Sequence, residues 1–298
     1  MSNVILKIDN LTKRYKDKVA LDHVSFEIQK GKIYGFIGEN GAGKTTTIRS
    51  ITGLSSIDEG RVELFGLSDS KGLQKARKKM GCLVERPILM LNESAFYNLK
   101  MQQMLFGQND DEKINKLLDR VGLGDVKQKK VKDFSLGMKQ RLGIAISLIN
   151  NPELIILDEP TSGLDPVARD ELLDILSEYI GDENRGVLFS THITADVERI
   201  ADYVTILHYG KVWFTGSKDE LVEKFAVLKG SVDDVTPELM KKLIGYHSYR
   251  SGFEALIATD DLAGISSELE YEKASIDEIL VYIAKEAKNE RHTESNEV

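Results

Sequence analysis

The chain has one cysteine among its 298 residues, Cys82. A single thiol excludes both an internal disulfide and a zinc site built from cysteines, and cytosolic residence is the simplest expectation. Long apolar runs are missing as well. Runs such as residues 154–157 and 204–207 have the length of buried strands, far below the roughly 18 residues that span a bilayer. The N-terminus alternates polar and apolar residues, so we expect no signal peptide.

An excess of basic charge is also missing. The 40 Lys and Arg residues stand against 48 Asp and Glu residues, which gives a net charge of −8 and a pI near 5.3. Nucleic-acid-binding proteins usually present a basic face. The short basic clusters at 77–79 and 127–130 are interpreted as solvated surface. We therefore expect no nucleic-acid partner.

One glycine-rich segment stands out against this ordinary composition. It fits the pattern G-x-x-x-x-G-K-[ST] and reads Gly38-Glu39-Asn40-Gly41-Ala42-Gly43-Lys44-Thr45. A short apolar run at 32–37 predicts a strand before it, and residues 46–51 open a predicted helix. Glycines let backbone N–H groups converge on phosphate oxygens, and a helix N-terminus adds the positive end of its dipole.

The segment predicts a site for a nucleoside triphosphate. Lys44 is expected to reach the β- and γ-phosphates, and the Thr45 hydroxyl is expected to ligate Mg²⁺. A glycine-rich turn that matches by chance is the alternative, and the flanking strand and helix argue against it. The predicted nucleotide-binding residues of this segment are Gly38, Asn40, Gly41, Ala42, Gly43, Lys44, Thr45 and Thr46.

A second signal is an apolar run, residues 154–157, that ends in Asp158 and Glu159. A buried strand that ends this way places its carboxylates at the sheet edge that carries the phosphate-binding loop. Asp158 is then a predicted Mg²⁺ ligand, and Glu159 a predicted general base for an attacking water. An exposed acidic turn is the alternative, which the glycine-rich segment disfavours.

The remaining pattern predicts an α/β chain with two parts. Alternating strands and helices around the loop imply a mainly parallel sheet that is covered on both faces. The first thirty residues and residues 61–66 predict antiparallel strands, and residues 94–123 read as helical. After residue 216 we predict a small α+β domain with strands at 249–259 and 269–272. A capping box at 275–278 begins its helix, whose apolar stripe is Ile276, Ile279, Leu280, Ile283 and Ala287.

Further motifs follow in a fixed order. Phe134-Ser135-Leu136-Gly137-Met138-Lys139-Gln140-Arg141 precedes the acidic strand, Ser162-Gly163-Leu164-Asp165 follows it, and His192 ends the apolar run 187–191. With the glycine-rich segment, they resemble the ATP-binding subunit of ABC transporters over about residues 3–220. Individually, Ser135 and Asp165 could be helix N-caps, His192 a strand-end residue and Tyr15 a surface aromatic.

The resemblance implies a RecA-like P-loop ATPase that uses ATP and Mg²⁺. The ATP-binding domain would comprise residues 1–220 with a helical subdomain at about 88–145, and residues 221–298 would form an accessory domain. Glu159, His192 and Lys44 would be catalytic, and Tyr15 would stack on adenine. Ser135, Gly137 and Asp165 would complete the site of a second subunit in trans.

Two departures accompany the resemblance. Leu136 and Met138 replace a glycine and a glutamine of the family signature, and Glu85 replaces the glutamine of the Q-loop. Glu85 is accordingly a predicted additional metal ligand. Both departures resemble the ABC-2-type branch that exports bacitracin, lantibiotics and other amphipathic peptides.

The resemblance also implies partners. ATP would lie between two subunits, so a homodimer is expected and a heterodimer remains open. A separate transmembrane permease would be reached through residues 85–97, which would place the chain peripherally at the cytoplasmic face of the cell membrane. Two alternatives remain: an ABC ATPase that acts on ribosomes or DNA, and a nucleotide-gated regulatory subunit. The single ATPase domain and the acidic balance disfavour the first.

Overall fold

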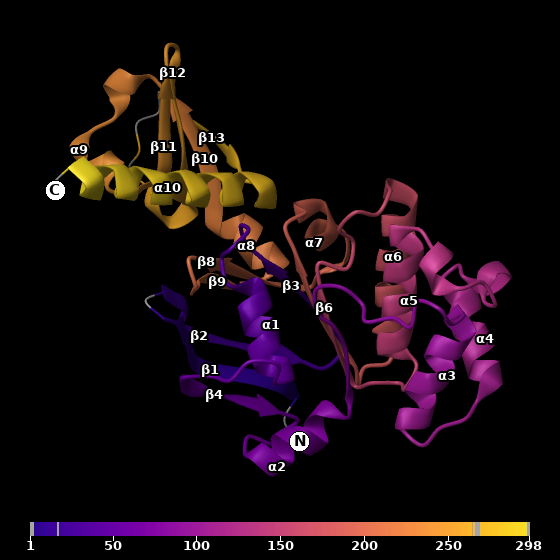
Figure 1. Cartoon of the computed structure of the whole chain (residues 1–298). Helices are drawn as coiled ribbons and strands as arrows, with labels where there is room; N and C mark the ends of the chain where they lie inside the picture. Colours follow the sequence, from indigo (N-terminus) through magenta and orange to yellow (C-terminus); the bar gives the residue numbers. More distant parts are fainter. Residues whose placement is uncertain (1–2, 17, 264, 266–268, 297–298) are drawn as a thin grey trace. The chain divides into compact units, whose positions relative to one another are not determined.

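The computed structural model describes the backbone of residues 3–16, 18–263, 265 and 269–296, and among these the side chains up to residue 286. The chain divides into two compact units, Met1–Thr215 and Gly216–Val298. Each unit is described by itself (Figure 1).

The first unit is built on a six-stranded sheet with the order β5-β6-β7-β3-β8-β9. Neighbours from β5 to β8 are parallel. A two-residue turn at Tyr209 and Gly210, both with left-handed φ, leads from β8 to β9. The inner strands are buried along almost their whole length, as expected for strands covered on both faces. The bounds are β5 Met80–Leu83, β6 Leu154–Asp158, β7 Gly186–Thr191, β3 Lys32–Ile37, β8 Tyr203–His208 and β9 Lys211–Ser217.

Helices pack against this sheet. α1 (Lys44–Thr52) contacts β6, α5 (Leu136–Leu148) contacts β5, and α7 (Thr194–Ile200) contacts β3 and β7. α6 (Pro166–Tyr179) packs on α7. Each of α1, α6 and α7 begins just after a strand ends, so their N-termini lie near the carboxyl edge of the sheet. This edge carries the candidate site.

A second, antiparallel sheet has the order β2-β1-β4, with β1 Val4–Tyr15, β2 Lys18–Gln29 and β4 Glu59–Leu64. Its apolar face shares one core with α1 and the central sheet. α2 (Ser70–Arg77) follows β4, and Asp69 caps its N-terminus. β1 and β2 span 12 residues each, and their antiparallel pairing runs from Val4–Gln29 to Tyr15–Lys18.

A helical region separates β5 from β6. It contains α3 (Ala95–Leu105), α4 (Asp111–Arg120), the 3₁₀ turns Gly124–Val126 and Val131–Asp133, and then α5. Ser94, Asp110 and Ser135 accept hydrogen bonds from the first turns of α3, α4 and α5. Such caps satisfy N–H groups that lack partners within the helix.

The second unit is an antiparallel sheet with the order β11-β12-β10-β13, against which the helix α10 (Ile276–Asn296) packs. The Ser275–Glu278 capping box is confirmed: the Glu278 amide donates to Ser275 Oγ and the Ser275 amide to Glu278 Oε2. Further elements are α8 Lys218–Lys224, β10 Phe225–Gly230, the 3₁₀ turn Val232–Asp234, α9 Pro237–Met240, β11 Leu243–Tyr249, β12 Gly252–Ala258, the 3₁₀ turn Thr259–Leu262 and β13 Glu270–Lys273.

The predicted fold class is confirmed, with one strand misplaced. The predicted strand 249–259 contains β12, Gly252–Ala258, but starts too early, because Tyr249 ends β11. The two strands form a hairpin that turns at Arg250 and Ser251, and the predicted strand includes the turn signal Ser251-Gly252. In α10, Ile276, Ile279 and Ile283 are buried as predicted, whereas the side chain of Ala287 lies outside the described residues.

Candidate active site

The glycine-rich loop connects β3 to α1, and two of its glycines have no room for a side chain. A Cβ atom at Gly38 would lie 2.2 Å from the Leu207 carbonyl oxygen. Gly43 has a left-handed φ of 111°, and a Cβ atom there would lie 2.7 Å from Leu21 Cδ2. The loop therefore stays close to β8 and β2, and its backbone turns into the first N–H groups of α1.

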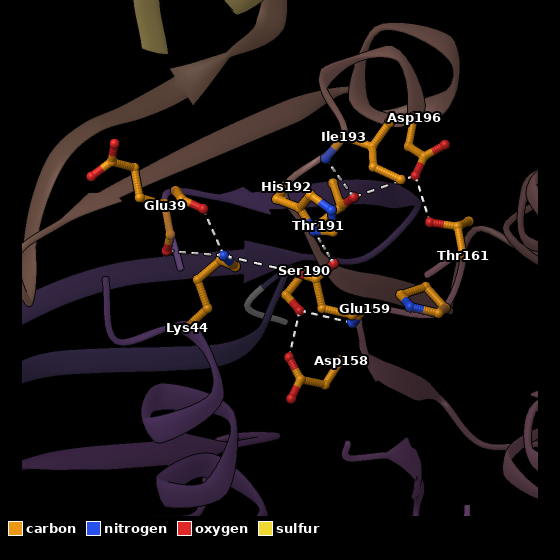
Figure 2. Close-up of polar contacts among 12 residues, drawn as sticks. Glu39, Lys44, Asp158, Glu159, Thr161, Ser190, Thr191, His192, Ile193 and Asp196 are labelled. Carbon is orange, nitrogen blue, oxygen red and sulfur yellow. Dashed lines mark hydrogen bonds and ion pairs between the residues drawn. The ribbon is translucent and has the colours of Figure 1, made fainter. Parts of the chain in front are cut away.

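Lys44 lies inside the loop and is only 6% exposed. Its ammonium donates to the Gly38 carbonyl at 2.6 Å and to the Glu39 carbonyl at 3.3 Å, and lies 3.6 Å from Glu159 Oε1 (Figure 2). Burial lowers the pKa of Lys44, while the nearby carboxylates of Glu159 and Asp158 act in the opposite direction. The lysine thus offers a positive charge at the centre of the loop.

Asp158 ends β6 and is 2% exposed. Its Oδ2 accepts the Thr45 hydroxyl at 2.9 Å, and its Oδ1 accepts the Ser190 hydroxyl at 2.6 Å. The strand order places β7 beside β6, so Ser190 orients the carboxylate from the neighbouring strand. The pair Thr45–Asp158 supplies two oxygen ligands of the kind that Mg²⁺ prefers.

Glu159 follows directly, with a left-handed φ of 49°. Its backbone N–H donates to Ser190 Oγ at 3.0 Å. Its Oε2 lies 2.7 Å from His192 Nδ1 (Figure 2). The same carboxylate thus faces Lys44 through one oxygen and His192 through the other, which places a base, a cation and an imidazole around one point.

These residues surround a cavity of about 510 Å³. Tyr15 is 46% exposed at its rim, and the Tyr15 hydroxyl lies 3.2 Å from Ser55 Oγ. The structure brings together nine of the predicted site residues in the lining: Tyr15, Asn40, Gly41, Gly43, Lys44, Thr45, Thr46, Glu159 and His192. Ala42 is buried behind the loop, where its carbonyl accepts the Gly210 amide at 2.9 Å.

The three residues predicted to act in trans do not line this cavity. Ser135 caps α5, accepting the Met138 amide at 3.2 Å, and Asp165 caps α6, accepting the Val167 and Ala168 amides. The Ala168 N–H bond lowers the pKa of Asp165. Gly137 lies against Leu164: a Cβ atom at Gly137 would be 3.3 Å from Leu164 Cδ2. The N-cap interpretation of Ser135 and Asp165 is confirmed.

Glu85, a predicted metal ligand, is placed differently. It follows β5 with a left-handed φ of 59°, and its Oε1 lies 2.6 Å from Arg49 Nη2 of α1. Glu85 thus forms an ion pair with a guanidinium. Among the residues that the structure describes, no group of three or more His, Cys, Asp or Glu side chains could hold a metal ion. Thr45 and Asp158 would hold Mg²⁺ only together with further oxygen ligands from phosphate and water.

The sequence did not predict two residues of the site. One is Ser190, which precedes Thr191 at the end of β7 and follows an apolar run. The other is Asp196, which is fully buried on α7. Asp196 accepts the Thr161 hydroxyl at 2.7 Å and the Thr191 hydroxyl at 3.3 Å (Figure 2). Asp196 also pairs with Arg169. It ties the segment after Glu159 to the end of β7. An acidic residue four positions after His192 was its only local signal.

We expect Asp196→Ala to lower the free energy of unfolding by about 3 kcal/mol, because the change leaves a partly buried guanidinium and two hydroxyls without their acceptor. Urea unfolding followed by tryptophan fluorescence and circular dichroism measures this. Asp174→Ala is the matched control: Asp174 pairs with Arg199 on the surface, so its loss should cost under about 1 kcal/mol. Equal losses in the two variants would contradict the bracing role of Asp196.

A parallel sheet, a glycine-rich loop that leads into a helix and an acidic neighbouring strand define a P-loop nucleotide-binding protein. The family model described as ABC transporter matches residues 21–162. The lantibiotic transport ATP-binding protein SrtF of Streptococcus pyogenes is 44% identical over 70% of this chain and 89% of its own length. The bacitracin transport ATP-binding protein BcrA of Bacillus licheniformis is 36% identical over 86% and 84%.

Solved structures agree with these relatives. An ATP-binding subunit of an ABC transporter is 33% identical, with a TM-score of 0.67 over 73% of this chain and 91% of that one. A dimeric ATP-binding cassette with bound ADP and phosphate is 25% identical, with a TM-score of 0.66 over 72% and 98%. The chain belongs to the ABC transporter family as an ATP-binding subunit. It is an ABC ATPase, as its motifs predicted.

Proposed function

We propose that this chain hydrolyses Mg-ATP to drive a separate membrane permease that exports antimicrobial or other amphipathic peptides. The arrangement of Lys44, Glu159 and His192 around one cavity carries the ATPase part. The export part rests on the named functions of the relatives, lantibiotic and bacitracin transport. Within the described residues, no helix has the length and hydropathy required to cross a bilayer.

The residues present fit ATP and Mg²⁺. The backbone N–H groups of the loop can approach phosphate oxygens because glycine has no side chain in the way. The positive charge of Lys44 would bind the β- and γ-phosphates. Thr45 and Asp158 would hold Mg²⁺, which neutralises phosphate charge when bound. Tyr15 at the rim would stack on adenine, with Gly38, Asn40, Gly41, Ala42, Gly43 and Thr46 shaping the loop. Glu85 stays a candidate for further metal contact.

We propose that Glu159 is the general base and His192 its partner. The Glu159 carboxylate would take the proton of the attacking water, and the 2.7 Å contact with His192 would hold that carboxylate in place. Ser190 would hold the Asp158 carboxylate and the Glu159 backbone in place through its hydrogen bonds to both.

We also propose that two copies of the chain complete each other's sites. Ser135, Gly137 and Asp165 lie outside the cavity of their own chain, and they would contact the nucleotide of the partner. The solved cassette with ADP and phosphate is a dimer, which supports this arrangement. A heterodimer with a related subunit is the alternative.

Residues 1–220, with their helical part at about 88–145, would form the ATPase domain, and residues 221–298 an accessory domain.

A second cavity of about 420 Å³ is the proposed contact with the permease, at the cytoplasmic face of the cell membrane. It lies between β5, the segment after it, and α5, and its lining includes Leu54, Val84, Pro87, Ile88 and Ile146. Ile88 is 99% exposed and Leu54 68%. Exposed apolar groups beside a hollow mark interaction sites, and a short amphipathic segment of the permease would fill this one.

We expect Ile88→Asp to reduce permease association at least about tenfold, because a hydrophobic anchor at the centre of an interface is commonly worth more than 1.4 kcal/mol. Co-purification from membranes measures association, and nucleotide binding by the isolated chain should be unchanged. Val232→Asp is the matched control, since Val232 is 45% exposed in the second unit. Undiminished association of the Ile88→Asp protein would remove this cavity as the contact.

The proposal as a whole is tested by purifying tagged Glu159→Gln protein with Mg-ATP from its native membranes and identifying bound proteins by mass spectrometry. A multi-span membrane protein is the expected result. A second ATPase subunit in the sample would replace the homodimer by a heterodimer. Ribosomal or DNA-bound proteins without a membrane partner would overturn the transport function.

A further inference from the structure

Two neighbouring strands end in the same way at the sheet edge that carries the nucleotide site. β5 and β6 are parallel, and Leu83 pairs with Leu157 in their register. Two residues after this pair, each strand is followed by a glutamate: Glu85 after β5 and Glu159 after β6. Both glutamates have left-handed φ values, 59° and 49°. With Asp158, this edge of the sheet holds three carboxylates.

Three carboxylates near a triphosphate disfavour its binding, because like charges repel, most strongly at low ionic strength. Asp158 and Glu159 have partners in the site: Thr45, Ser190, Lys44 and His192. The ion-pair partner of Glu85, by contrast, does not line the cavity. That partner is Arg49, at 2.6 Å.

Arg49 belongs to the helix that begins at the phosphate-binding loop. It lies four residues after Thr45, so both side chains lie on one face of α1. From this face Thr45 bonds to Asp158 after β6, and Arg49 pairs with Glu85 after β5. One helix face therefore holds the carboxylates of two adjacent strands, one turn apart.

The pair has little to contribute to stability. The Arg49 and Glu85 side chains are 43% and 52% exposed, and ion pairs with such exposure contribute about 0–1 kcal/mol at most. Their charge nevertheless lies beside the phosphate-binding helix. A functional effect on an anionic ligand thus requires no large effect on folding, and the two can be separated by experiment.

We propose that Arg49 is a positioning residue of the nucleotide site. Its guanidinium holds the Glu85 carboxylate against α1 and offsets its charge, so that the triphosphate can bind beside a third acidic strand end. This inference rests on the ATP site proposed above and is independent of the permease.

The expected result is a rescue between two neutral substitutions. Arg49→Gln leaves Glu85 unpaired, and we expect the Kd for ATP to rise roughly tenfold at low salt, which corresponds to about 1.4 kcal/mol. In EDTA, where no metal ion is available for Glu85 to contact, Glu85→Gln should bind ATP as well as the native chain or more tightly. The double variant Arg49→Gln/Glu85→Gln should recover native affinity, and Arg49→Lys should retain most of it. The loss in Arg49→Gln should shrink at high salt.

Equilibrium binding of a fluorescent ATP analogue to the isolated full chain, in EDTA and again with Mg²⁺, provides the measurement. Thermal unfolding of the same proteins should show closely similar midpoints. A double variant that binds as weakly as Arg49→Gln alone would overturn the proposal, as would an Arg49→Gln protein with native affinity. If the native chain binds no nucleotide, while its unfolding midpoint is normal, the ATP site itself fails and this inference fails with it.

Discussion

Glutamine in place of Glu159 should lower the rate of ATP hydrolysis by about 10²- to 10⁴-fold, the range that a general base contributes. Glutamine has nearly the same shape but cannot take a proton from water. The backbone bonds of residue 159 to Ser190 do not involve the side chain, so the strand end keeps its conformation. The loss therefore reports on proton transfer and not on folding.

Nucleotide binding should survive this substitution and even strengthen, because one of the carboxylates beside Lys44 becomes neutral. We expect Glu159→Gln protein to accumulate as a dimer when Mg-ATP is present, since closure is no longer followed by hydrolysis. Steady-state phosphate release and size-exclusion chromatography with light scattering measure the two effects.

Glu112→Gln is the control for this experiment. Glu112 lies on α4 with its side chain 78% exposed and pairs only with Lys116 among the recorded ion pairs of the described residues. The same chemical change there should leave hydrolysis unaltered. A Glu159→Gln protein with the native hydrolysis rate would remove Glu159 from the role of general base.

Lys44→Ala should weaken ATP binding by roughly a hundredfold or more, because hydrogen bonds to charged groups contribute about 1.5–3 kcal/mol each and Lys44 would make more than one to the phosphates. The substitution also leaves Asp158 and Glu159 without the cation that faces them, so the phosphates would meet uncompensated negative charge. Both effects act in the same direction.

Isothermal titration with ATP measures the loss in Lys44→Ala protein. Lys79→Ala is the matched control: it removes the same charge from the opposite edge of the sheet, where Lys79 is 53% exposed and pairs with Glu153. ATP affinity should be native in that variant. Native affinity in Lys44→Ala would contradict the proposed contact with the phosphates, and a large fall in its unfolding midpoint would show that the loop had changed.

The two substitutions, Lys44→Ala and Glu159→Gln, affect different steps of the ATPase reaction. Lys44 concerns binding, and Glu159 concerns the proton transfer that follows, although the two side chains are only 3.6 Å apart. A kinetic separation is therefore informative: loss of affinity with Lys44→Ala, and loss of turnover at retained affinity with Glu159→Gln. The opposite assignment would require a different geometry of the water and the phosphates.

The sequence by itself determined the loop and the acidic strand end, because both are local. Gly38 to Thr45 is a contiguous run whose conformation depends on glycine, and Asp158 and Glu159 follow an apolar strand directly. The capping box at Ser275 was equally local, since its two bonds join residues three positions apart. The start of β12 was also signalled locally, by the turn residues Ser251 and Gly252, although the predicted strand extended across them.

Only the tertiary structure decided what holds these groups in place. Ser190 reaches Asp158 across 32 residues, Thr161 meets Asp196 across 35, and Arg49 meets Glu85 across 36. Each contact depends on which strands are neighbours, and the order β5-β6-β7-β3 follows from burial of whole faces rather than from any short pattern. The chemistry of the site was thus local, while the positions and compensation of its charges came from the packing of the sheet.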